Sequence, residues 1–234
     1  MQEKNYLSVI IFVLIVFALL IGGNYLIRNK GSISTTKIND IRLDKNNDYV
    51  YFSDSDTVSE ELDLVYNTIH LNIDNKDAKK LEEELNKGMI SAKNSIKTLD
   101  EVSIDKNDIV YELDDDNNVY EADYIKYDIL ESTNYLTIGV VKGHLNITSD
   151  VDNNTLKYYT FKKSDGHIMS MDEIKSAGKI KNSDILDTEK SYLEDKIDTE
   201  IKSYELYMDK YENVRMNMLV NSGDITYNDT VKIN

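Results

Sequence analysis

Apolar and polar positions alternate with two different periods along this chain, after one continuous apolar run near the N-terminus. Residues 7–27 read LSVIIFVLIVFALLIGGNYLI and contain no charged side chain. A helix rises about 1.5 Å per residue, so roughly 20 residues cross a hydrocarbon core of ~30 Å. Tyr6 and Tyr25 lie near the two ends of the run, where membrane proteins place aromatic residues. The run therefore predicts an uncleaved transmembrane helix.

Two other interpretations of this run stay open: a cleaved secretory signal, although no A-x-A-like site follows it, and a soluble core helix. The charges beside the run do not fix its orientation, because Lys4 precedes it while Arg28, Lys30 and Lys37 follow it. The predicted organisation is a short cytoplasmic N-terminus (1–6), a transmembrane helix (7–27), a stalk (28–40), and a domain in two parts (41–150 and 151–234).

The first part of the domain alternates strand-like and helix-like patterns. A short strand-like run at 48–52 precedes an acidic loop, and residues 66–73 alternate as a half-buried strand whose apolar face includes Ile69, Leu71 and Ile73. Apolar residues then recur every three or four positions from 78 to 96, which predicts an amphipathic helix capped by Asp74 or Asn75. Further strands are expected at 108–113, 119–132, 135–147 and 156–163, with a β-bulge near Tyr124–Ile125 where the alternation slips.

The second part of the domain begins its helices with recognisable caps. Ser170 and Glu173 form a capping box for a short helix that Gly178 can end. Apolar residues from 186 to 211 then mark one stripe, which predicts a long helix from about residue 182 to Asn213. Two strands at 214–220 and 225–233 close the chain. This order predicts an α+β fold of antiparallel sheets packed with helices.

The charge of the chain is strongly negative. The formal net charge is −16, and residues 1–30 contribute +2 through Glu3, Lys4, Arg28 and Lys30, which leaves −18 on residues 31–234. Such a domain repels nucleic acid and attracts cationic partners, although an acidic surface also serves simply to keep a protein soluble. The chain has no cysteine, which excludes disulfides, thiolate metal sites and thiol nucleophiles.

The sequence offers little catalytic chemistry. His70, His144 and His167 have no histidine partner four residues away and no H-E-x-x-H context. The acidic segments that begin at Asp114 and Asp150 start like calcium-binding loops but lack the glycine at the sixth position. No phosphate-binding loop or G-x-S-x-G motif occurs. We therefore predict no catalytic, cofactor-binding or metal-binding residue, expect no cofactor, and leave the ligand-binding residues unassigned.

Several short segments together resemble a known bacterial module. IRLDKNNDYVYF followed by NTIHLNIDNKDAKKLEEELNK resembles its opening strand–strand–helix unit, and YDILESTNYLTIGVV its paired strands. KYYTFKKSDGHIMSMDEI is similar to its hairpin and capped helix, with matching residues at Tyr159, Phe161, Asp165, Gly166, Ser170 and Ile174. The module is the extracytoplasmic two-part domain of lysozyme-sensing anti-sigma-V factors and of some peptidoglycan deacetylases. The resemblance covers roughly residues 40–234.

This resemblance implies an orientation that the charges leave open, with the acidic domain outside the membrane of a Gram-positive bacterium. Only six residues precede the apolar run, so neither an anti-sigma activity nor a deacetylase activity is carried over. The expected function is a non-enzymatic, membrane-anchored binding or sensing module at the cell envelope, whose ligand is a wall component or a cationic secreted protein. An assembly partner of another membrane protein is the alternative. A cell-wall hydrolase would need a nucleophile, a metal site or an isolated carboxylate pair that the sequence does not single out.

Overall fold

The computed structural model describes residues 48–104, 108–111, 118–149, 153–223 and 225–233. The predicted cytoplasmic N-terminus, transmembrane helix and stalk therefore lie outside the described residues. Among the residues that are described, no helix is both long and apolar enough to cross a membrane. These residues form antiparallel sheets with packed helices, which confirms the α+β class.

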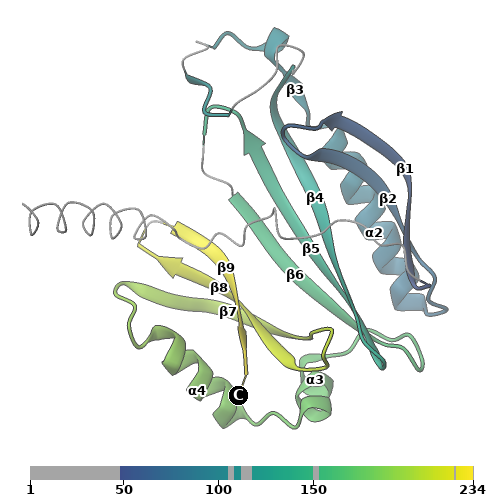
Figure 1. Cartoon of the computed structure of the whole chain (residues 1–234), viewed down its shortest axis with the longest axis vertical. Helices are drawn as coiled ribbons and strands as arrows, with labels where there is room; N and C mark the ends of the chain where they lie inside the picture. The colour runs from purple at the N-terminus through teal and green to yellow at the C-terminus, as the bar shows by residue number, and fades with distance from the viewer. Residues whose placement is uncertain (1–47, 105–107, 112–117, 150–152, 224, 234) are drawn as a thin grey trace, which may run out of the picture. The chain divides into compact units, whose positions relative to one another are not determined.

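The described residues form three antiparallel sheets (Figure 1). The first sheet pairs β1 (Val50–Ser59) with β2 (Leu64–Leu71). The second has the order β3 (Lys97–Thr98), β4 (Val119–Glu131), β5 (Tyr135–Asn146) and β6 (Asn153–Lys162). The third has the order β7 (Thr199–Met208), β8 (Val214–Ser222) and β9 (Ile225–Lys232). The helices are α2 (Lys76–Lys93), α3 (Met171–Gly178) and α4 (Asn182–Leu193), with a 3₁₀ turn at Leu99–Glu101.

Helix α2 confirms the predicted amphipathic pattern. Its cap is Asn75, whose side chain accepts a hydrogen bond from the Asp77 amide, and its buried residues are Ala78, Leu81, Leu85, Met89 and Ala92. Two polar side chains of the helix also bond to the outer edge of β2: Asn86 bonds both the N–H and the C=O of Ile69, and Glu82 accepts from the Leu71 N–H. The helix thus covers an apolar face and also satisfies a strand edge that would otherwise be unpaired.

The bulge predicted near Tyr124–Ile125 is wrong, because the pairing of β4 with β5 is continuous through both residues. Register shifts lie elsewhere: β4 shifts against β3 between Val119 and Glu121, and β1 shifts against β2 near Asp54, which has a φ of +51°. The apolar and polar alternation in β4 slips because its centre is covered on both faces, so that four consecutive residues from Tyr124 to Tyr127 are buried. One of them, Lys126, is paired with Asp63. Burial on both sides removes the alternation without adding a residue.

Two further expectations are corrected. A strand was predicted at 108–113, but residues 108–111 are not in a strand. The edge of β4 is paired with β3. The predicted helix from 182 to 213 ends at Leu193, and residues 199–208 form strand β7. Tyr204, Leu206 and Met208 fit a strand as well as a helix, because alternate residues of β7 share one face of the sheet. Ile197 and Tyr211, which the helical stripe would have buried, are 86% and 72% exposed.

The three-stranded sheet is joined to the edge of β6 by three polar side chains, of which Asn217 and Asn228 are buried and Glu205 is partly buried. Glu205 accepts from the Tyr158 N–H at 2.7 Å, Asn228 accepts from the Leu156 N–H at 3.0 Å, and Asn217 donates to the Leu156 carbonyl at 2.9 Å. These three side chains come from β7, β9 and β8. They bond backbone groups of β6, which is an edge strand, in the place where a further strand would otherwise pair with it. Burial raises the pKa of Glu205, although its bonds from Tyr158 and Asn217 act in the opposite direction.

Candidate functional site

A tight turn between β6 and α3 brings charged residues together. The chain folds back after Lys162, where the Lys162 N–H donates to the His167 carbonyl at 3.1 Å and the Gly166 N–H donates to the Lys162 carbonyl at 2.8 Å. Gly166 has a φ of +69°, and a Cβ atom there would lie 2.5 Å from the Cγ2 atom of Ile73. Only glycine suits both the left-handed backbone and the close packing, so the turn is pressed against the end of β2 and the start of α2.

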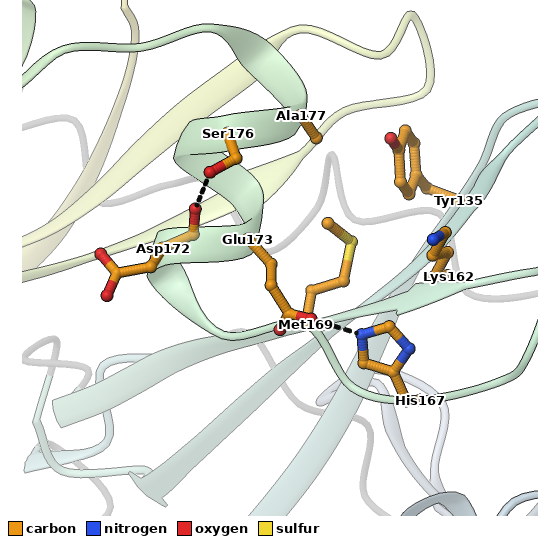
Figure 2. A pocket seen from close by; sticks show the side chains of 8 residues that line it. All are labelled: Tyr135, Lys162, His167, Met169, Asp172, Glu173, Ser176 and Ala177. Atoms are coloured by element: carbon orange, nitrogen blue, oxygen red, sulfur yellow. Dashed lines mark hydrogen bonds and ion pairs between the residues drawn. The ribbon is translucent and has the colours of Figure 1, made fainter.

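His167 is held between two carboxylates at this turn. Its Nδ1 atom lies 2.6 Å from Asp165 Oδ1, and its Nε2 atom lies 2.9 Å from Glu173 Oε1, the contact drawn in Figure 2. An imidazole ring can donate from both nitrogens only when it carries a positive charge. The hydrogen bond to Asp165 is the main cause that raises the pKa of His167, and the bond to Glu173 adds to it. His167 is therefore favoured as a cation without a free lone pair.

Glu173 connects this histidine to the start of helix α3. Its carboxylate accepts from the backbone N–H and the hydroxyl of Ser170, both at 2.8 Å, while the Glu173 N–H donates to the Ser170 hydroxyl. This reciprocal pair confirms the predicted capping box, and Gly178 is the last residue of the helix, as predicted. The bonds from Ser170 are the main cause that lowers the pKa of Glu173. The helix start, the turn and the histidine thus form one hydrogen-bonded unit.

A cavity of about 330 Å³ lies between this unit and β5. Figure 2 shows Tyr135 and Lys162 on one side of the cavity and the first turns of α3 on the other. Tyr135, Met169 and Ala177 supply apolar surface, and Lys162 and Asp172 supply charge of opposite sign at the rim. The volume and the mixed lining suit a small group with an apolar body and polar substituents.

The other two histidines lie apart from this cavity. His70 on β2 stacks on Tyr51 with ring centres 4.6 Å apart, and its Nε2 atom lies 2.8 Å from the Ser53 hydroxyl. His144 on β5 lies 2.8 Å from Asp123 of β4. Each histidine therefore has its own carboxylate or hydroxyl partner. The described part of the chain contains no group of three or more potential metal-binding side chains. The acidic segments beginning at Asp114 and Asp150 lie in part outside that region.

Sequence reasoning did not find the partners of His167 or the cavity. The resemblance places Asp165 and Gly166 in a hairpin, and the capping box predicts the role of Glu173, but no local pattern indicates that His167 lies between the two carboxylates. Tyr135 comes from a strand 32 residues earlier in the chain, and its place opposite α3 follows from the pairing of β5 with β6.

No protein-family model matches this chain, and no curated protein sequence matches it.

Proposed function

We propose that this protein is a non-enzymatic, membrane-anchored binding or sensing module on the outer side of a Gram-positive cell membrane. The apolar run at 7–27 supplies the anchor, and the resemblance to the lysozyme-sensing module supplies the orientation and the class of role. The ligand is a wall component or a cationic secreted protein.

The observation that carries the choice of binding over catalysis is the double hydrogen bond of His167. A histidine that acts as a general base or binds a metal must offer a free lone pair on one nitrogen. Here Asp165 and Glu173 occupy both nitrogens and favour the charged ring, and Glu173 is also committed to the cap of α3. The unit is built to hold a cavity wall in place, which is what a binding site requires.

The net charge of −18 on residues 31–234 supports a cationic protein as one class of ligand. The charge is dense in the β1–β2 hairpin, where residues 54–63 include Asp54, Asp56, Glu60, Glu61 and Asp63 and no lysine or arginine. Two of these carboxylates are paired, Asp56 with Lys93 and Asp63 with Lys126. The others give the hairpin a negative field that would steer a basic protein toward it.

The orientation is tested by adding protease to intact cells from which the wall has been removed. Residues 31–234 should be degraded, and the apolar segment should be spared. Complete protection of the domain until the cells are lysed would place it in the cytoplasm and end the sensing proposal.

Binding is tested with lysozyme, a basic wall hydrolase, and the full-length chain in lipid nanodiscs over a series of salt concentrations. Specific recognition should leave micromolar or tighter affinity at ~0.15 M salt, where the Debye length is about 8 Å, with a slower association rate as the main change. Lysozyme with acetylated lysines is the matched control and should bind more weakly. Loss of all binding by ~0.15 M salt would show ion exchange without recognition, and the assembly-partner alternative would then take precedence.

A further inference from the structure

A second cavity, of about 420 Å³, lies between the β1–β2 hairpin and helix α2, which lie beside each other in Figure 1. Tyr51 and His70, which are opposite each other in the register of the two strands, line the cavity on one side. Lys79, Glu82 and Glu83 line it from the helix. This cavity shares no lining residue with the one beside α3, so the two are separate candidate sites.

The Tyr51 ring gives this cavity an aromatic surface. The ring stacks on His70, with the ring centres 4.6 Å apart and an angle of 16° between the planes. The stack covers one face of the Tyr51 ring, and the residue is still 44% exposed. A planar cation packs favourably on an accessible tyrosine ring, because the ring face carries partial negative charge. The stacked pair is therefore a platform for a flat cationic group.

Two hydrogen-bond acceptors face each other beside this platform. The Ser53 hydroxyl lies 2.9 Å from Asp54 Oδ2 and 2.8 Å from His70 Nε2. A hydroxyl has one proton and an ionised carboxylate can only accept, so Ser53 donates to Asp54 and accepts from the Nε2–H of His70. The neutral ring then has its lone pair at Nδ1, which lies 3.7 Å from Glu82 Oε1. A donor supplied by a ligand would satisfy both acceptors.

The same side chains do not form a Ser–His–Glu catalytic triad. In a triad the serine gives its proton to the histidine, and the histidine donates from its other nitrogen to the carboxylate. Here the Ser53 proton goes to Asp54, and the 3.7 Å between His70 and Glu82 is longer than a hydrogen bond. The other oxygen of Glu82 already accepts from the Leu71 N–H at 2.7 Å. The arrangement therefore suits the binding of a donor.

The lining of the cavity carries more negative than positive charge. Glu82 and Glu83 supply two carboxylates, and Lys79 supplies one ammonium group. Lys79 pairs with Asp74 at 3.3 Å, whereas Glu83 makes no hydrogen bond or ion pair with any residue that the structure describes. Lys79 precedes Glu83 by four residues on α2, a spacing at which opposite charges attract. A cationic ligand is thus attracted to the cavity and competes with Lys79 for Glu83.

From this arrangement we infer that the cavity between the β1–β2 hairpin and α2 binds the guanidinium group of an arginine on a basic protein. The inference rests on the proposed function and selects the cationic protein among its two ligand classes. A guanidinium group is planar and has five N–H donors and no acceptor. Its plane packs on Tyr51, while its N–H groups donate to His70 Nδ1 and to the two carboxylates. A lysine ammonium has the same charge but no plane to stack.

The experiment compares three capped peptides that differ at one position, Gly-Gly-X-Gly-Gly with arginine, lysine or citrulline at X. Binding to the full-length chain in nanodiscs is measured by ligand-observed NMR titration. Citrulline keeps the shape of arginine without its charge, so that peptide should bind at least about tenfold more weakly. The lysine peptide should bind about threefold more weakly than the arginine peptide, because it loses the stacking and the paired donors.

Variants of the chain test the individual contacts. Tyr51→Ala and Glu83→Gln should each weaken binding of the arginine peptide about three- to fivefold. Lys79→Gln should strengthen it about twofold, because the competing cation is removed. Glu84→Gln is the matched control: it removes the same charge at the next exposed position of α2, outside the cavity, and should bind within about 1.5-fold of wild type.

Equal affinity for the arginine and citrulline peptides, or equal effects of Glu83→Gln and Glu84→Gln, would overturn the inference. So would the absence of measurable binding of the arginine peptide. Lysozyme binding that survives at physiological salt and is unchanged in Tyr51→Ala and Glu83→Gln would remove this inference and leave the proposed function standing. Selective binding of the arginine peptide without lysozyme binding would support the site and count against lysozyme as the protein that it recognises.

Discussion

The buried side chains that join the third sheet to β6 give a sharp test of how this fold is held together. Asn228 is 8% exposed, and its side-chain oxygen accepts from the Leu156 N–H at 3.0 Å. Replacement with leucine keeps a similar volume but leaves that N–H buried with no acceptor. The substitution also removes the longer contact at 3.4 Å from Asn228 to Asn217.

The expected cost follows from the asymmetry of buried hydrogen bonds. An unsatisfied buried N–H costs about 1–3 kcal/mol, and the leucine returns part of this through its own burial. A net loss of about 1–2 kcal/mol lowers the Tm of a domain of this size by roughly 2–8 °C. Asn228→Leu should therefore unfold at a clearly lower temperature than wild type.

The assay is thermal unfolding followed by circular dichroism, combined with amide hydrogen exchange. The Leu156 amide should exchange faster in Asn228→Leu, because it has lost its only side-chain acceptor. Asn221→Leu is the matched control on the neighbouring strand β8. Asn221 is partly exposed, donates to Glu200 at 3.4 Å and accepts from the Thr226 hydroxyl at 3.0 Å, and both bonds are exposed to solvent. Its replacement should therefore change stability by less than about 0.5 kcal/mol. Equal Tm values for the two variants, with unchanged exchange at Leu156, would show that side chains do not replace a strand at the β6 edge.

Two other perturbations test the helix packing and the histidine. Leu85→Asp places an unpaired charge at a position that is 1% exposed, and should lower the free energy of unfolding by several kcal/mol. Ile90→Asp, at a 64% exposed position of the same helix, should lower it by less than about 1 kcal/mol. Similar urea midpoints for the two variants would contradict the packing of α2. The raised pKa of His167 means that its stabilising effect is complete below the unfolded value of about 6.5 and is lost as pH rises through the folded value. His167→Gln should therefore destabilise the protein most near pH 6 and progressively less above it, as measured by thermal unfolding over a series of pH values. His144→Gln is the control. A loss of stability in His167→Gln that does not change with pH would refute the charged form of His167.

The sequence by itself determined the elements whose pattern depends on near neighbours. The stripe in α2 needs only one apolar face, and the capping box needs only Ser170 and Glu173, three residues apart. The paired strands β4, β5 and β6 were predicted from their β-branched and aromatic runs. Antiparallel sheets with packed helices followed from the order of these elements.

Other features needed the tertiary structure, because they depend on partners far away in the chain. Residues 199–208 match both a helix and a strand, and pairing with β8 decides for the strand. The slip in β4 came from burial on both faces, which no local pattern records. The partners of Asn228 lie on strands of two separate sheets, and Tyr135 reaches the cavity beside His167 through the pairing register of β5 with β6. A one-residue shift in that register would turn each side chain to the opposite face, so these sites are fixed only by the folded chain.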